Sequence, residues 1–382
     1  MTILEEAERV MRICNACRYC EGFCAVFPAM ELRRTFASAD LKYLANLCHD
    51  CRDCYYACQY APPHEFSLNF PKSLAELRLE TYREFAWPKA MQRLFPYNGL
   101  TVLLTTLLSV IGMVAGVYLL KGASVLFSAH VGENAFYRIV PYAFIILTFS
   151  AVAVFISAVL LVGVRCLWLE MGAKTMDWFD LRSHIRTLGD VVRLRYLGGS
   201  GYSCNYPNDR FSMLRRWFHQ MMLFGFLLCL VSTAIAANYE HLFHWHAPYP
   251  FTSWPVLTGT LGGLALLIGA GGSFILKLRM DKTPAGPSQG MDLGFILLLF
   301  TTSLTGLLLL ALRDTSAMGL LLSIHMGLVL ALFLTLPYGK FLHSFYRYAA
   351  LLLKNIQESR SDSGNRTREE RGQGDAGQDS QN

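Results

Sequence analysis

Six long apolar segments constrain the fold of this chain from about residue 96 onward. None contains a charged residue, and each is close to the ~20 residues that a helix needs to cross a bilayer. Hydrophobic residues make up 53% of the 382 residues and charged residues 16%. The sequence therefore predicts an integral membrane protein. Its six predicted spanning helices are 99–120, 139–164, 217–239, 255–276, 293–312 and 315–339.

The basic residues predict the orientation of these spans. Segment 165–216 carries nine Lys or Arg residues, whereas 240–254 carries none, and cytoplasmic loops are the ones enriched in Lys and Arg. The N-terminus lacks the basic and apolar regions of a signal peptide. We therefore expect both termini and the 165–216 insert on the cytoplasmic side of a bacterial inner membrane. Such loops explain the net charge of +6 without a nucleic acid partner.

Two copies of one cysteine pattern precede the first span. Both read Cys-x2-Cys-x2-Cys-x3-Cys, and their members are Cys14, Cys17, Cys20, Cys24, Cys48, Cys51, Cys54 and Cys58. This spacing is typical of the ligands of two [4Fe-4S] clusters. Cytoplasmic thiols stay reduced, which argues against disulfides, and structural zinc sites usually pair simple Cys-x2-Cys knuckles. Residues 1–95 are thus predicted to form a helical, two-cluster ferredoxin-like domain.

The pairing of the cysteines follows a known rule. In two-cluster ferredoxins the fourth cysteine of each run binds the other cluster. That rule places Cys58 with the first three cysteines of the first run, and Cys24 with those of the second. The proline that usually follows the fourth cysteine is replaced by Ala25 and Gln59. This departure weakens the pairing more than it weakens the clusters.

Histidines inside the predicted spans suggest a second cofactor. A histidine within the membrane needs a polar partner, and His325 lies in the sixth span. His343 follows eighteen residues later, which is five full helical turns, so both histidines are expected to project from one face of one helix, about 27 Å apart along its axis. His219, at the cytoplasmic end of the third span, is matched with His343. We expect this pair to hold an inner b-type haem.

The partner of His325 is less defined. An outer haem would need His241 or His244 as its second ligand, and His246 is close by. The alternative is that His325 hydrogen-bonds a neighbouring helix, and that His219 and His343 are ordinary interfacial residues. Three arginines stand where they would meet haem propionates, although loop orientation explains them equally well: Arg215, Arg216 and Arg347.

The remaining segments are assigned structural roles. The six glycines of 259–272 predict close helix packing rather than a nucleotide loop. The glycine-rich turn 198–201 lacks the Lys of a phosphate-binding loop, and a helix is expected over 179–196. Residues 355–382 contain almost no apolar residues beyond Ile356 and are expected to be disordered.

The predicted fold class is all-α, a two-cluster module followed by a six-helix transmembrane bundle. Its expected parts are 1–95, 96–164, the insert 165–216, the haem-binding helices 217–345 and the tail 355–382. The chain shows no Rossmann fingerprint, Ser-His-Asp set or acidic metal site, which indicates that substrate chemistry and flavin binding belong to another subunit.

Several sequence stretches resemble the tricarballylate/citrate utilization protein B family. They are 14–24, 196–207, Arg215-Arg216-Trp217-Phe218-His219, 247–250 and 336–340. The resemblance implies a membrane protein with two iron-sulfur clusters and haem, which reoxidises a partner FAD-dependent dehydrogenase and passes electrons to membrane quinone. The family often has a second histidine after His219, where this chain has Gln220.

Two other classes of function remain open. A redox-sensing or docking anchor would hold a partner at the membrane without reducing quinone, although it needs no buried histidines. A thiol-active subunit of the heterodisulfide type would carry a Cys-Cys-Gly motif, which is absent.

Overall fold

The computed structural model describes residues 2–199, 201 and 203–378, and for residues 362–378 it describes only the helical backbone. Within these residues the fold is helical apart from one small antiparallel pair of strands, β1 (Cys204–Asn205) and β2 (Phe211–Ser212). The prediction of an all-α chain is confirmed. Ser200 and Tyr202, in the glycine-rich stretch, lie outside the described residues.

The chain divides into two compact units. We call residues 1–81, 164–202 and 343–382 the cysteine unit, and residues 82–163 and 203–342 the membrane unit. The cysteine unit is thus assembled from three separate segments of chain. The sequence predicted domains that follow one another along the chain, with boundaries at residues 95, 165 and 216. It did not predict that three separate segments form one unit.

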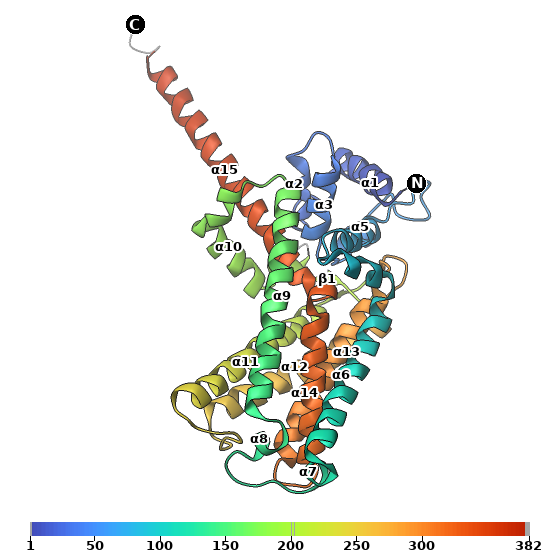
Figure 1. Cartoon of the computed structure of the whole chain (residues 1–382). Helices are drawn as coiled ribbons and strands as arrows, with labels where there is room; N and C mark the ends of the chain where they lie inside the picture. The colour runs from blue at the N-terminus through green and yellow to red at the C-terminus, as the bar shows by residue number, and fades with distance from the viewer. Residues whose placement is uncertain (1, 200, 202, 379–382) are drawn as a thin grey trace. The chain divides into compact units, whose positions relative to one another are not determined.

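The cysteine unit is built from short helices and the last helix of the chain (Figure 1). They are α1 (Ile3–Cys17), α2 (Val26–Glu31), α3 (Ser38–Leu47), α4 (Asp53–Tyr56), α5 (Phe70–Glu84), η2 (Thr175–Phe179), α10 (Leu181–Val192), η3 (Arg195–Gly198) and α15 (Leu342–Gln378). Helix α1 begins with a capping box, in which Thr2 and Glu5 each accept a backbone N–H of the other.

Polar contacts join the three segments of the cysteine unit. The Lys42 ammonium lies 2.7 Å from a carboxylate oxygen of Glu170. The Asn355 amide donates to the Thr187 hydroxyl over 2.9 Å, and both residues are buried. These contacts show that the insert and the last helix complete the same core as the cysteine-rich segment.

The C-terminal segment differs from the expectation of a disordered tail from residue 355. Helix α15 continues through that point, Asn355 and Ile356 are buried, and Arg360 forms an ion pair with Asp177. The polar composition of this segment gave the wrong expectation, because its first residues pack and pair with other segments of the cysteine unit. Residues 379–382 lie outside the described part of the chain.

The membrane unit contains the six helices that the apolar segments predicted. They are α6 (Asn98–Lys121), α9 (Tyr142–Glu170), α11 (Leu214–Leu242), α12 (Trp254–Leu278), α13 (Gln289–Leu312) and α14 (Met318–Thr335). All six are long and apolar enough to cross a membrane. Shorter turns link them: η1 (Lys89–Tyr97), α7 (Ala123–Phe127), α8 (Ala135–Ile139) and η4 (Leu336–Tyr338).

Glycines bring α11 and α12 into direct backbone contact. A Cβ added to Gly262 would lie 2.9 Å from the Cys229 nitrogen, and one added to Gly269 would lie 2.7 Å from the Phe218 carbonyl oxygen. Small residues allow this approach where no hydrophobic effect drives association. The expectation of close helix packing in this glycine-rich span is confirmed.

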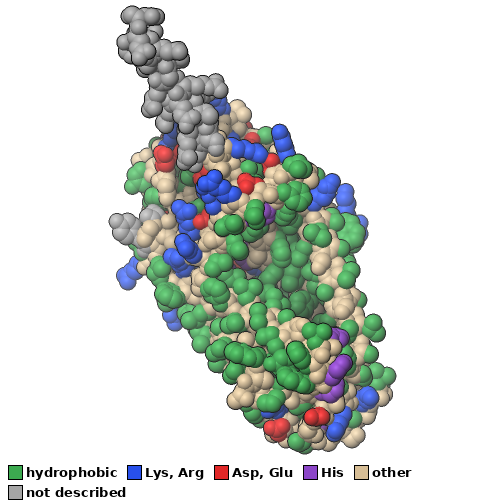
Figure 2. Space-filling view, turned by 90° about the vertical axis from the view of Figure 1, so that its left-hand side faces the viewer, with side chains coloured by type: hydrophobic (Ala, Val, Ile, Leu, Met, Phe, Trp, Pro, Cys, Tyr) green, Lys and Arg blue, Asp and Glu red, His purple; other side chains and the backbone are tan. Residues whose placement is uncertain are grey.

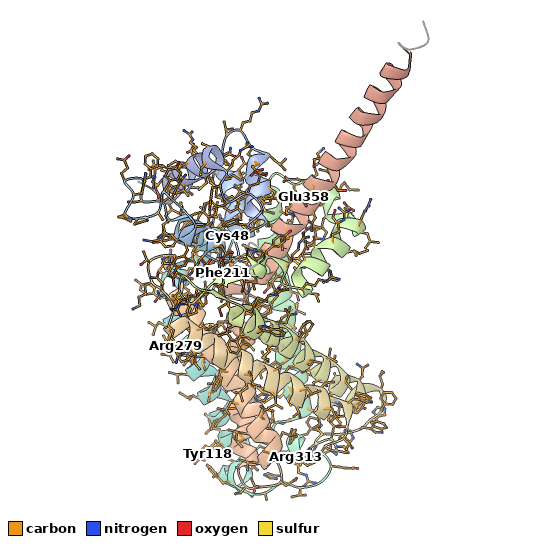
Figure 3. All side chains as sticks on the ribbon, turned by 180° about the vertical axis from the view of Figure 1, so that it is seen from behind. Cys48, Tyr118, Phe211, Arg279, Arg313 and Glu358 are labelled. Carbon is orange, nitrogen blue, oxygen red and sulfur yellow. The ribbon has the colours of Figure 1, made fainter. Side chains whose placement is uncertain are left out.

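The outer surface of the membrane unit is apolar (Figure 2). On α9, Leu147, Val154 and Leu161 are 71%, 71% and 72% exposed, and their seven-residue spacing puts them on one helical face. A soluble protein rarely exposes such a continuous apolar stripe. The chain is therefore a multi-pass membrane protein. Arg279, after α12, lies at the opposite end of this unit from Tyr118 and Arg313 (Figure 3).

The sixth span does not continue into the final helix. Helix α14 ends at Thr335, η4 follows, and α15 begins at Leu342. Pro337 has no backbone N–H to donate, and Gly339 is extended, with φ −123°. The expectation that His325 and His343 project from one face of one continuous helix is therefore wrong.

Polar side chains hold this break in place. The Asn98 amide donates to the Tyr338 carbonyl over 2.6 Å. Asp292 of α13 is buried between two ammonium groups, 2.5 Å from Lys277 of α12 and 2.8 Å from Lys340. The segment 336–340 is thus tied to the ends of three membrane helices.

Candidate functional site

The first cysteine run folds around the end of α1. Cys14 and Cys17 occupy its last turn, where Arg18 takes a left-handed conformation (φ 56°) and its N–H bonds the Cys14 carbonyl. This turn brings Cys20 back toward the helix. These three cysteines line one cavity together with Cys54 and Cys58 from the second run. We call Cys14, Cys17, Cys20 and Cys58 the first set.

Electrostatics group the same four thiols. Burial raises the pKa of the Cys14 thiol well above its ordinary value, and the strongest neighbouring charge that raises it further is that of Cys58. Burial likewise raises the pKa of Cys20 to about 12, again with Cys58 as the strongest neighbour. Cys58 therefore lies nearer to the first run than its place in the sequence suggests.

We call the other four cysteines, Cys24, Cys48, Cys51 and Cys54, the second set. Burial raises the pKa of Cys24 to about 12, with Cys48 as the strongest neighbouring charge. Burial also raises the pKa of Cys54 well above its ordinary value, and Cys24 is its strongest neighbour. Cys24 thus lies with cysteines of the second run, while the full crossed pairing given by the ferredoxin rule stays a prediction.

The donor chemistry of both sets suits iron-sulfur clusters. Burial and mutual repulsion oppose eight free thiolates, and a bound cationic centre reverses that balance. Across the described residues, no three His, Cys, Asp or Glu side chains converge closely enough to hold a single metal ion. In a [4Fe-4S] site each cysteine sulfur binds a different iron, so the four cysteines lie further apart than four ligands that share one zinc ion.

Charged side chains that the sequence analysis did not assign to the clusters surround these cysteines. Arg52, 1% exposed, lies 3.7 Å from the Asp50 carboxylate, and the neighbouring Asp53 is also buried. The Arg347 guanidinium of α15 donates to the Cys48 carbonyl over 2.8 Å, and Figure 3 labels Cys48 in this unit. Only the three-dimensional fold brings Arg347 to Cys48, since the two residues are distant in sequence.

The histidines of the membrane unit have protein partners. The Thr305 hydroxyl of α13 lies 3.1 Å from His325 Nδ1, which is the neighbouring-helix contact named above as the alternative. His241 ends α11 with its Nε2 2.6 Å from the Tyr142 hydroxyl. His244 lies beyond that helix, with φ 54°.

Two further placements concern the predicted inner haem. His219 lies near the start of α11 in the membrane unit, and His343 lies in the first turn of α15 in the cysteine unit. Their pairing stays a prediction. Of the arginines matched with propionates, Arg347 contacts the Cys48 loop and Arg215 stacks over the Tyr206 ring at 4.7 Å.

Comparisons with known proteins agree along nearly the whole chain. Residues 7–84 match the family model of the Citrate utilization protein B Fer4-like domain, which covers all eight cysteines, and residues 96–364 match that of Citrate utilization protein B. Citrate utilization protein B of Escherichia coli is 48% identical over 360 residues, 93% of each chain. No solved structure matches. The chain belongs to the citrate utilization protein B family.

Proposed function

We propose that this chain is the electron-transfer subunit that reoxidises a partner FAD-dependent dehydrogenase and reduces membrane quinone. Its proposed cofactors are two [4Fe-4S] clusters and one or two b-type haems. The partner's substrate is proposed to be tricarballylate, citrate or a similar tricarboxylate, because the Escherichia coli relative is named for citrate utilization. The proposed site is the bacterial inner membrane, with the clusters and both termini in the cytoplasm.

The single observation that carries this proposal is that cysteines of both runs come together in one cavity, in a chain with six apolar helices. When bound, such clusters supply one-electron steps between a two-electron flavin and a quinone. The chain's own residues hold the sulfurs in fixed positions and exclude water from Cys48 and Cys51, which are buried.

The haem part of the proposal assigns ligands to both sides of the bundle. His219 and His343 would hold the inner haem. For an outer haem, His325 would be one ligand, and binding through its Nε2 would keep the contact between its Nδ1 and the Thr305 hydroxyl. Its second ligand would be His241 or His244.

Anaerobic purification of the full chain tests both parts. We expect about eight non-haem iron and eight sulfide per chain, four of each per cubane, together with haem absorption bands that sharpen on reduction. The flavin of the reduced partner dehydrogenase should then regain its oxidised visible absorption in the presence of quinone only when this chain is added. A chain without iron and sulfide would overturn the proposal.

A histidine variant separates the haem assignment from the clusters. His343→Ala should lose haem absorption and quinone reduction while keeping iron and sulfide. His130→Ala, in the loop after α7, is the matched control and should keep all three. Unchanged haem content in His343→Ala would refute the inner pairing.

One observation favours a second candidate, the redox-sensing or docking anchor. His325, His241 and His246 all have hydrogen-bond partners within the protein, the last from Glu240 at 2.8 Å. Each of these three histidines thus has its own polar partner, and none of these contacts requires haem. Under this alternative the partner's flavin would reduce the clusters, and quinone would stay oxidised.

A further inference from the structure

We propose that Arg347 gives the cluster held by the second set a higher reduction potential than the cluster held by the first set. An electron that reaches the cysteine unit would then come to rest beside α15. The inference rests on the cluster part of the proposed function, and it names the residue that sets the direction of transfer within the unit.

The positive charge of Arg347 lies on one side of the pair of sets. Its Nη2 donates to the Cys48 carbonyl oxygen over 2.8 Å, and arginine stays protonated in proteins. A reduced cluster carries one more negative charge than an oxidised one, so a nearby fixed cation stabilises the reduced form.

Hydrogen bonds to sulfur act in the same direction. Cys24 accepts the backbone N–H groups of Val26 and Phe27, and the Asp50 N–H lies 3.4 Å from the Cys48 sulfur. Such bonds withdraw charge from the sulfurs and raise a cluster's potential. In the first set, the Tyr60 N–H bonds Cys58 at 3.4 Å.

Burial of Cys48 and Cys51 works against reduction of the second cluster. The positive charge of Arg347, which is half-buried, opposes that effect.

The arrangement also gives the transferred electron an exit. Arg347 and His343 are four residues apart on α15, and residues at that spacing share a helical face. They are about 6 Å apart along the helix axis. The helix that raises the potential of the second cluster thus also carries the proposed inner haem ligand.

Potentiometric titration followed by electron paramagnetic resonance tests the inference on the full chain. We expect two cluster signals that are reduced at different potentials. Arg347→Gln should weaken reduction of the higher-potential cluster at least tenfold, a fall of 59 mV for one electron, and leave the other unmoved. Arg347→Lys keeps the charge and should retain most of the difference. Iron and sulfide per chain show whether both clusters are present.

Two cysteine variants test the order without relying on Arg347→Gln being stable. Cys14→Ser should keep the higher-potential signal, and Cys48→Ser should keep the lower one. The inference is overturned if these assignments are reversed, if both potentials are equal, or if Arg347→Gln lowers both signals alike. A wild-type chain with no clusters would instead refute the proposed function.

Discussion

At the scale of single residues, both cysteine runs fold by the same backbone device. Arg18 (φ 56°) follows Cys17 and Arg52 (φ 71°) follows Cys51, so that the second cysteine of each run precedes a left-handed residue. A non-glycine residue there costs roughly 1–3 kcal/mol unless its surroundings favour it. The spacing predicts eight donors, because ligand spacing is local. It does not predict Arg347, whose contact depends on tertiary structure.

Serine substitutions test which cysteines act together. Cys58→Ser and Cys14→Ser should abolish the same electron paramagnetic resonance signal, because both side chains line the first cavity. Cys24→Ser and Cys48→Ser should abolish the other signal. Cys166→Ser is the control, since Cys166 is exposed and belongs to neither set. If Cys58→Ser instead removed the signal that Cys48→Ser removes, the crossed arrangement would be wrong.

At the scale of elements, backbone contact between α11 and α12 distinguishes this bundle from one packed by large side chains. The glycine-rich span predicts close packing, because small residues are what such packing needs. It does not predict which helix is the partner. The structure shows that α11 and α12 are partners, because a Cβ on Gly225 of α11 would lie 2.8 Å from the carbonyl oxygen of Gly262 of α12.

An alanine at one of these positions should destabilise the membrane unit. Gly262→Ala places a methyl group 2.9 Å from the Cys229 nitrogen, and overpacking of this kind costs about 1–3 kcal/mol. Thermal unfolding in detergent should show a lower midpoint. Gly116→Ala of α6 is the matched control, because a Cβ there meets nothing within 4 Å. Equal midpoints for the two variants would contradict the packing argument.

The ion pair between η2 and α15 should make stability depend on pH. The Arg360 hydrogen bond to Asp177, at 2.6 Å, is the main cause that lowers the pKa of the Asp177 carboxyl. A lowered folded pKa stabilises the fold fully above the ordinary pKa of aspartate, and this contribution is lost as the pH falls through the lowered value.

Arg360→Gln should therefore lower the unfolding free energy near neutral pH by about 0.2–1 kcal/mol, the range for exposed pairs. The gap from wild type should close in acid, as followed by thermal unfolding. Arg12→Gln, which removes an exposed pair with Glu8 within one helix, is the control. A gap that stays constant with pH would rule out the Asp177 explanation.

At the scale of the whole molecule, the sequence predicts the membrane helices well but does not predict which distant segments pack together. The six apolar helices follow from segment length, and all six are present. The break after Thr335 was missed because Pro337 and Gly339 lie in an otherwise apolar stretch. No local sequence pattern indicates that three segments assemble into the cysteine unit. This assembly depends on contacts between distant residues, such as that of Asn355 with Thr187.

The proposed orientation can be measured in cells with a membrane-impermeant maleimide. In a Cys166→Ser background, Thr252→Cys, between α11 and α12, should be labelled in intact spheroplasts. Arg210→Cys, before α11, should be labelled only after permeabilisation. Both positions are exposed. The opposite pattern would place the cysteine-rich segment outside the cytoplasm.

The three-segment cysteine unit has a consequence for biosynthesis. A ribosome makes Cys48 early, but Arg347, which binds its carbonyl, emerges 299 residues later. Every membrane helix is synthesised between them. A nascent or truncated chain thus has all eight thiols but lacks the helix that closes around the second set. We expect the second cluster to be completed only after membrane insertion, so that interrupted synthesis leaves the site of this cluster unfinished.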